Sequence, residues 1–166
     1  MSDLQCAATL LVCCAGEAEY DGGAASLTLA GRNRARELGQ SLRSTRIAMV
    51  YTSSQPPAVQ TAELAAAAGG AVVHVRDALR EPAEGESPEQ VRARFAEELQ
   101  GIVDLHRGET VLVVSHSGAV RSAVPALAGN LPDDYGVTHE PGPCAVTEVA
   151  VDGDGWLVRS WAGQPV

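Results

Sequence analysis

Apolar residues in this chain occur in short continuous runs that alternate with longer segments where they recur every three or four positions. The short runs predict buried strands, and the segments with helical spacing predict helices that pack one face against a sheet. The predicted strands cover residues 7–14, 47–51, 71–75, 110–114 and 145–151, and the predicted helices cover residues 26–42, 58–68, 88–106 and 118–127. This alternation predicts an α/β fold, a three-layer arrangement with a mainly parallel sheet between helices.

Breaks between these elements carry ordinary turn signals. Gly69-Gly70 ends the second helix and Pro88 begins the third, whereas residues 52–57, 77–86 and 132–143 are predicted loops. Residues 152–155, Asp-Gly-Asp-Gly, predict a hairpin turn between residues 145–151 and 156–161 rather than a calcium loop, which would need a Glu where Gly163 stands. With no internal repeat or linker, residues 1–166 are expected to form a single domain.

Composition narrows the class of function. The chain has 45% hydrophobic but only 4% aromatic residues, so Ala, Val and Leu must fill its core. A net charge of −9 argues against nucleic acid and anionic membranes as partners. All twelve basic residues are Arg, which excludes Schiff-base chemistry on Lys. No leader is evident and no apolar run approaches the roughly 20 residues of a membrane span, so a soluble, cytoplasmic protein is expected.

The four cysteines give no sign of a metal site. Cys6, Cys13, Cys14 and Cys144 lack Cys-x-x-Cys spacing, so no zinc site and no thioredoxin-type site is predicted. In a reducing compartment such cysteines are most often buried as small apolar residues. We expect neither a metal nor a cofactor.

Two strand ends carry the most informative motifs. Residues 9–14 run into the small turn Ala15-Gly16, and residues 110–115 end on His116 with Gly118 two positions later. Other fragments follow in a fixed order: Leu27-Thr28-x-x-Gly31-Arg32, Val50-Tyr51-Thr52-Ser53, Ala58-Val59-Gln60-Thr61-Ala62-Glu63, Leu79-Arg80-Glu81 and Asp152-Gly153-Asp154-Gly155-Trp156. In this order and spacing the chain resembles the histidine phosphatase superfamily, the phosphoglycerate-mutase-like proteins, over nearly its whole length.

The resemblance implies an active site of which only part is present. In that family the first strand ends in Arg-His-Gly, whose His accepts the phosphoryl group, and a later strand ends in a second His. His116 matches the second His and Glu81 matches the family's acid. The best register places Cys14 at the first Arg and Ala15 at the nucleophilic His; a register one residue earlier places Cys13 and Cys14 there.

A second arginine of the family is also missing, because Pro57 stands at its position. Charge-assisted hydrogen bonds contribute about 1.5–3 kcal/mol each, so losing two Arg removes roughly 3–6 kcal/mol of phosphate binding. Deleting a nucleophile lowers the rate on the order of 10⁶-fold. We therefore predict that the chain is not a phosphatase or mutase of that mechanism. A Cys-x5-Arg phosphatase is excluded as well, because Glu19 and Tyr20 stand where its Arg would be.

Three candidate catalytic residues remain, and each has an alternative interpretation. Cys14 with His116 could form a thiol nucleophile and its base, or the cysteines could be inert packing. His116 could contact a ligand at the end of a parallel strand or only cap that strand. Glu81 could be an acid or an ordinary loop carboxylate. The predicted pocket residues around them are Cys13, Ala15, Gly16, Pro57, Ser115 and Ser117.

Two classes of function follow from this pattern. The first is a pseudoenzyme or binding protein that holds a small molecule of low negative charge. The second is a repurposed enzyme in which His116 and Glu81, with or without Cys14, perform acid–base or thiol chemistry on a non-phosphorylated metabolite. Such a pair could isomerise, cyclise, dehydrate or hydrolyse. A short covering insert between Glu81 and Thr110 implies a small or open pocket, and the sequence leaves a homodimer open.

Overall fold

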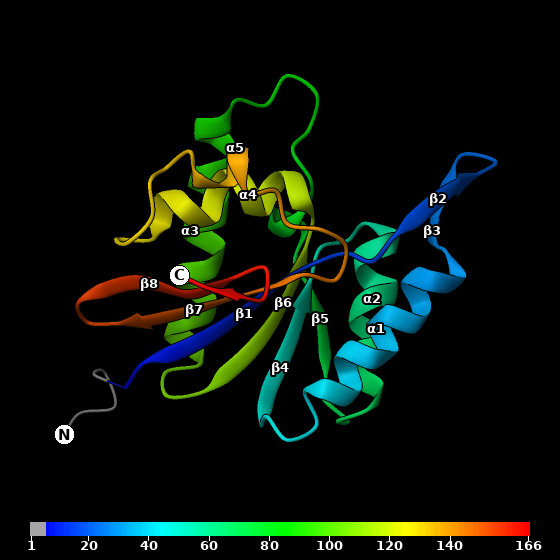
Figure 1. Cartoon of the computed structure of the whole chain (residues 1–166), viewed down its shortest axis with the longest axis horizontal. Helices are drawn as coiled ribbons and strands as arrows, with labels where there is room; N and C mark the ends of the chain where they lie inside the picture. The colour runs from blue at the N-terminus through cyan, green and yellow to red at the C-terminus, as the bar shows by residue number, and fades with distance from the viewer. Residues whose placement is uncertain (1–5) are drawn as a thin grey trace.

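A central sheet of seven strands, in the order β5-β4-β6-β1-β7-β8-β9, organises residues 6–166, the part of the chain that the computed structural model describes (Figure 1). Its strands are β1 (Ala8–Cys14), β4 (Ile47–Thr52), β5 (Val73–Val75), β6 (Thr110–Ser115), β7 (Val146–Asp152), β8 (Gly155–Trp161) and β9 (Gln164–Pro165). The strands β5, β4, β6 and β1 are parallel, and β7 pairs antiparallel with β1 to begin an antiparallel edge. The predicted α/β class and largely parallel sheet are confirmed.

Helices cover both faces of the sheet. The helices α1 (Leu29–Ser41) and α2 (Pro56–Ala67) lie on one face, and α3 (Pro88–Leu105), α4 (Ser117–Leu127) and the short α5 (Tyr135–Thr138) lie on the other (Figure 1). Alternation along the strands explains the two layers, because successive side chains point to opposite faces. In β1, Leu10 and Val12 pack in the core beneath α3 and α4, whereas Leu11 and Cys13 pack beneath α1 and α2.

Local signals fix where the helices begin. The hydroxyl of Thr28 accepts a hydrogen bond from the amide of Gly31 at 3.0 Å and so caps α1. A capping box between Ser87 and Gln90 begins α3. Helix α2 begins two residues earlier than predicted, at Pro56, because proline suits the first turn of a helix, where amides need no partner.

A hairpin that the hydrophobic pattern did not predict projects from the body of the molecule (Figure 1). Strands β2 (Ala18–Asp21) and β3 (Ala24–Leu27) pair across a Gly22-Gly23 turn, and both glycines adopt the positive φ that such two-residue turns require. The first helix was predicted from residue 26, which was wrong: residues 26 and 27 belong to β3. Between Glu81 and Thr110, α3 packs on the sheet, so only the loop of residues 82–87 remains as a covering segment.

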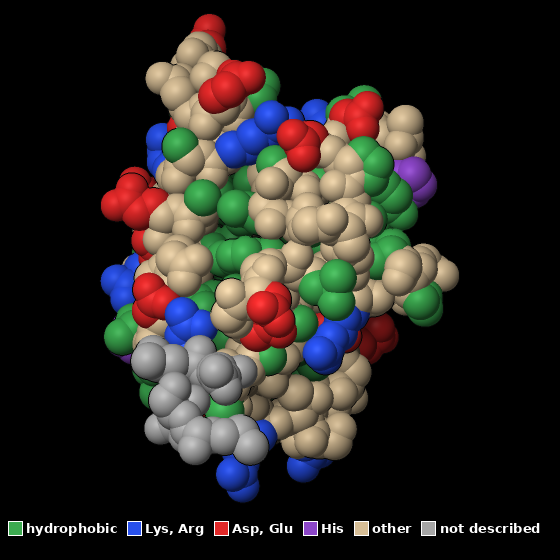
Figure 2. Space-filling view, turned by 90° about the vertical axis from the view of Figure 1, so that its left-hand side faces the viewer, with side chains coloured by type: hydrophobic (Ala, Val, Ile, Leu, Met, Phe, Trp, Pro, Cys, Tyr) green, Lys and Arg blue, Asp and Glu red, His purple; other side chains and the backbone are tan. Residues whose placement is uncertain are grey.

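One face of the molecule is mixed in charge. On the face shown in Figure 2, acidic and basic side chains lie interspersed around apolar ones. Within residues 6–166, none of the helices combines the length and the apolar character needed to cross a bilayer. The candidate site lies at the carboxyl ends of β1, β4 and β6, which lead into the loops before β2, α2 and α4.

Candidate functional site

The carboxyl ends of β1, β4 and β6 bring together segments that lie far apart in the sequence. Cys14 ends β1, Ser53 follows β4, and Ser115 ends β6 directly before His116. Cys14 and Ser115 are register partners in the β1–β6 pair. In open α/β sheets ligands bind beside the carboxyl ends of the strands, so this end of the sheet is the candidate site.

His116 is held by a side chain rather than by the backbone. Its Nε2 lies 2.7 Å from the hydroxyl oxygen of Ser53, a residue that is fully buried after β4. Burial lowers the pKa of His116 to about 4, so the imidazole is neutral at physiological pH. A neutral imidazole can accept or donate one proton, which makes it competent as a base but gives it no charge with which to hold an anion.

Glu81 caps helix α4. Its Oε1 accepts a hydrogen bond from the amide of Ala119 at 3.0 Å, and its carboxylate lies so close to Gly118 that any added Cβ there would collide with it. The amide of Glu81 donates to Gln55 Oε1 at 2.8 Å, which fixes the loop. Burial raises the pKa of Glu81, and the hydrogen bonds from the amides of α4 act against that rise. Its carboxylate therefore interacts with the helix terminus that begins next to His116.

The two adjacent cysteines point to opposite faces of the sheet. Cys14 packs in the core beneath α3 and α4, and Cys13 packs beneath α1 and α2, where its thiol donates to the carbonyl oxygen of Cys14 at 3.2 Å. Burial, and after it the charge of Glu81, raises the pKa of the Cys14 thiol to about 12; burial also raises the pKa of Cys13 well above its ordinary value. Neither cysteine is a thiolate at neutral pH, which favours the packing interpretation over the nucleophile.

The turn after β1 is closed by hydrogen bonds of its own. The amide of Ala15 donates to the carbonyl of Ser115 at 2.8 Å, and the amide of Gly16 donates to the hydroxyl of Thr61 at 2.9 Å. The Thr61 hydroxyl in turn donates to the carbonyl of Pro57 at 2.7 Å, in the first turn of α2. The predicted pocket residues Gly16 and Pro57 are thus joined through Thr61, and the amide of Gly16 is already occupied.

Three of the predicted residues line an open cavity of about 430 Å³ at this end of the sheet. Cys14, Ala15 and Ser117 form its inner wall, and the loop of residues 140–143 forms its outer wall. Ser115, which was predicted to line the pocket, is instead fully buried, and its hydroxyl donates to the carbonyl of Leu79 at 2.6 Å. Its side chain ties β6 to the segment before Glu81.

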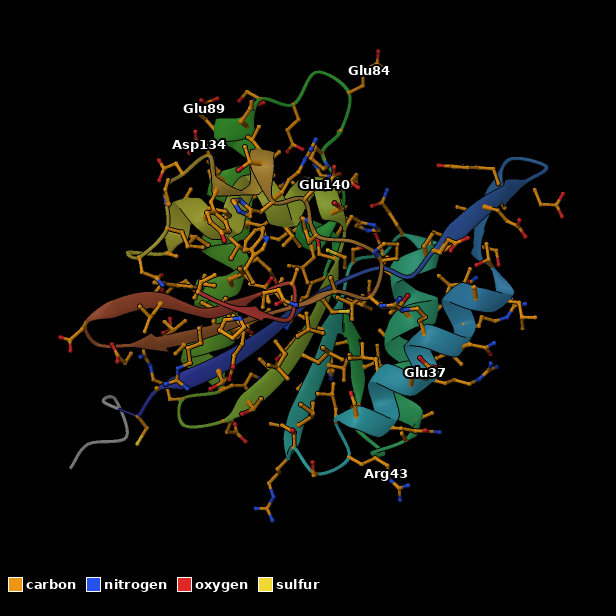
Figure 3. The ribbon with its side chains drawn as sticks, in the orientation of Figure 1. Glu37, Arg43, Glu84, Glu89, Asp134 and Glu140 are labelled. Carbon is orange, nitrogen blue, oxygen red and sulfur yellow. The ribbon has the colours of Figure 1, made fainter. Side chains whose placement is uncertain are left out.

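Glu140 gives the cavity an acidic wall. It lies on the loop beside α4, above the strand ends (Figure 3), and its Oε1 accepts a hydrogen bond from the Ser117 hydroxyl at 3.3 Å. The guanidinium of Arg121 lies 3.7 Å from the same oxygen. The negative charges of Glu81 and Glu140 both raise the pKa of Cys14, so both carboxylates act electrostatically on the inner wall of the cavity. The wall of the cavity therefore carries the carboxylate of Glu140 with the guanidinium of Arg121 beside it.

Sequence reasoning did not select Ser53, Thr61, Glu140 or Cys144 as site residues. Ser53 and Thr61 belong to two of the sequence fragments that resemble the family, so the resemblance could have marked them as site residues. Cys144 has a positive φ of 56°, and its amide donates to the carbonyl of Cys14 at 3.2 Å, which seals the loop onto β1. No local pattern marked Cys144 or Glu140. Among the described residues, no group of three or more His, Cys, Asp or Glu side chains is arranged to hold a metal ion.

Comparison with known proteins identifies the family whose pattern the chain carries. A model of the histidine phosphatase superfamily (branch 1) matches residues 16–85 and 81–164, which together span most of the chain. A search of curated protein sequences found no significant match.

Solved structures share the architecture across almost the whole chain. Bacillus stearothermophilus YhfR is 26% identical, with a TM-score of 0.80, and the match covers 96% of this chain and 98% of that one. A mutant phosphoserine phosphatase from Entamoeba histolytica in complex with phosphoserine is 17% identical, with a TM-score of 0.81 and coverage of 94% and 97%. A mycobacterial glucosyl-3-phosphoglycerate phosphatase is 20% identical, with a TM-score of 0.78 and coverage of 94% and 99%. The last two likenesses concern the fold alone.

Proposed function

This chain belongs to the histidine phosphatase superfamily, and we propose that it has lost phosphoryl transfer and binds a small metabolite of low negative charge at the carboxyl ends of β1 and β6. The end of β1 is the observation that carries the proposal. In the family pattern an Arg and a nucleophilic His stand there, whereas this chain has Cys14 and Ala15, or Cys13 and Cys14 in a register one residue earlier, and neither register contains a His. A methyl group cannot accept a phosphoryl group, and the Cys14 thiol is protonated and buried.

The charges around the cavity support the same proposal. A phosphoryl dianion needs several cationic or N–H donors aimed at its oxygens, because its transfer depends mainly on positioning and electrostatic stabilisation. Here Pro57 replaces an Arg, His116 is neutral, and Glu140 lines the cavity wall. Arg121, the cation beside this wall, already lies 3.7 Å from Glu140. A neutral or cationic metabolite fits this environment better than a phosphate ester.

A phosphatase assay with a restored variant tests this proposal. The wild-type protein should release phosphate from p-nitrophenyl phosphate and phosphoserine no faster than His116→Ala, and radiolabelled substrate should leave no phosphoenzyme. The triple substitution Cys14→Arg, Ala15→His, Pro57→Arg returns the missing groups and should raise phosphate release by about 10²-fold. Wild-type turnover above that of His116→Ala, together with a labelled phosphoenzyme, would contradict the proposal.

A second candidate function rests on the state of His116. Its neutral imidazole, oriented by Ser53 at 2.7 Å beside the cavity residue Ser117, is suited to act as a general base on a non-phosphorylated metabolite. Glu81 would be the partner acid, but its carboxylate is engaged by the amide of Ala119. For this reason we place binding first. A metabolite that raises the melting temperature of the wild type and is chemically unchanged after incubation supports binding, whereas conversion that His116→Gln abolishes supports the enzyme.

A further inference from the structure

A second cavity, of about 350 Å³, lies at the end of the molecule opposite the candidate site. It opens between the C-terminal ends of α1 and α2 and the start of β4. Figure 3 shows the two ends of the molecule: Glu140 lies above the strand ends, and Arg43, at the mouth of this second cavity, lies at the lower end. Its volume falls within the range typical of small-ligand pockets.

Small residues on α1 and α2 leave this space unfilled, because Gly39, Ala65 and Ala66 present no side chain larger than a methyl group to it. Helices α1 and α2 are pressed together at Gly39, where an added Cβ would lie 2.6 Å from the carbonyl oxygen of Ala65, so the contact holds their axes at a set distance. Strand β4 contains a bulge between Ile47 and Val50. The two residues inside the bulge, Ala48 and Met49, both pack against the core on the other face of the sheet. Ile47 and Val50, which pair with Thr110 and Leu112, therefore both stay on the cavity face, and the extra residue of the bulge adds its side chain to the opposite face.

One wall of the cavity is apolar, and its mouth is polar and basic. Ile47, Val50 and Ala66 form part of an apolar wall, whereas the turn of residues 43–46 supplies the exposed side chains Arg43 and Arg46. Neither arginine makes an ion pair with any residue of the described range 6–166, although the protein carries a net charge of −9. Two cations outside any ion pair of the described residues, beside a cavity with one apolar wall, are complementary to an anion with a hydrocarbon body.

We propose that this cavity binds a small apolar carboxylate, with the hydrocarbon part inside and the carboxylate at Arg43 and Arg46. The C-terminal carbonyls of α1 and α2 also face this end of the molecule and carry partial negative charge, which alone would favour a cation. The two guanidinium groups outweigh that partial charge, because each carries a full positive charge and can donate two parallel hydrogen bonds to a carboxylate.

Isothermal titration calorimetry with sodium octanoate tests the proposal, with octylamine and 1-octanol as probes of the same length. Octanoate should bind with a stoichiometry of one and should bind more tightly than either of the other two. Arg43→Gln combined with Arg46→Gln should weaken octanoate binding about tenfold, as expected for the loss of two solvent-exposed ion pairs, and should leave octanol binding unchanged. The control Arg36→Gln removes an exposed arginine elsewhere on α1 and should have no effect.

A filling substitution tests the location. Ala66→Leu places a larger side chain in the cavity and should abolish octanoate binding while the melting temperature stays at or above that of the wild type. If that variant does not fold, the arginine pair still decides the question. Absence of octanoate binding to the wild type, equal binding of octylamine, or full binding by the double arginine variant would each overturn the proposal.

Discussion

The Oε1 atom of Glu81 accepts a hydrogen bond from the amide of Ala119 at 3.0 Å, and this contact ties the loop after η2 (Asp77–Leu79) to the first turn of α4. Helix α4 begins at Ser117, and the side chain of its N-cap residue, His116, makes no capping hydrogen bond. A carboxylate from a distant loop therefore caps the N-terminus of α4, which a Ser, Thr or Asp at the N-cap position usually does. The residue that the family resemblance marks as an acid is thus also a structural element.

Removing this cap should destabilise the protein. Glu81→Ala is expected to lower the free energy of unfolding by about 1 kcal/mol, the usual effect of losing an N-cap. Glu81→Gln keeps an amide oxygen that can accept the same hydrogen bond and should not show this loss. Urea denaturation at pH 7 compares the three proteins; a Glu81→Ala variant as stable as the wild type would show that the contact contributes nothing.

The pH dependence of Glu81 follows from the direction of its pKa. Burial raises the pKa of the folded carboxyl above its unfolded value, so folding favours the protonated form. The stability that this group contributes is complete below the unfolded pKa and is lost as the pH rises through the folded pKa. Glu81→Gln cannot ionise, so its stability relative to the wild type should increase from pH 4 to pH 7. Denaturation curves at both pH values measure this, and a decrease over that range would contradict the assigned shift.

His116 should resist protonation far below the usual range of histidine. Burial lowers its pKa to about 4, so the stability contributed by the neutral imidazole is complete above the unfolded value of about 6.5 and is lost as the pH falls toward 4. The loss should reach up to about 3 kcal/mol, and His116→Gln should remove it. A proton NMR titration of the imidazole checks the pKa directly; a midpoint near 6.5 would show that the ring is solvated.

Alkylation should distinguish the buried cysteines from the exposed one. A pKa of about 12 for Cys14 reduces its thiolate fraction about 10³-fold relative to a thiol with the ordinary value of 9.0. With iodoacetamide at pH 8, Cys6 should therefore be modified first, and Cys14 should remain unmodified while the protein is folded. Peptide mass spectrometry over time measures the modification of both cysteines. Rapid modification of Cys14 would contradict the raised pKa and would support Cys14 as a thiol nucleophile.

Two helical glycines should respond to the same substitution in opposite ways. In Gly39→Ala the new Cβ would lie 2.6 Å from the backbone oxygen of Ala65, so α1 and α2 would have to separate, at a cost of about 1–3 kcal/mol. In Gly101→Ala the new Cβ in α3 meets no atom within 4 Å, and the higher helix propensity should stabilise the protein by about 0.5–1 kcal/mol. Thermal unfolding of both variants tests the pair; two shifts of the same sign would contradict the packing argument.

Much of the fold was predictable because its signals are local. Residues 10–14 form a continuous apolar run that predicts a strand buried on both faces, and Pro88 marks the first turn of α3. The hairpin of residues 18–27 was missed because its strands are mostly exposed and have no apolar run. Its Gly22-Gly23 turn was the available signal.

The sequence by itself determined the order of the main strands and helices of the three layers, the family, and which chemical groups stand at the strand ends. The tertiary structure decided what those groups do. Ser53 and His116 are 63 positions apart, and Glu81 and Ala119 are 38 apart, so each pair meets only when the sheet and α4 assemble. Burial then sets the protonation of His116 and Cys14, because the free energy of a charge depends on the surrounding solvent and neighbours rather than on residue type alone.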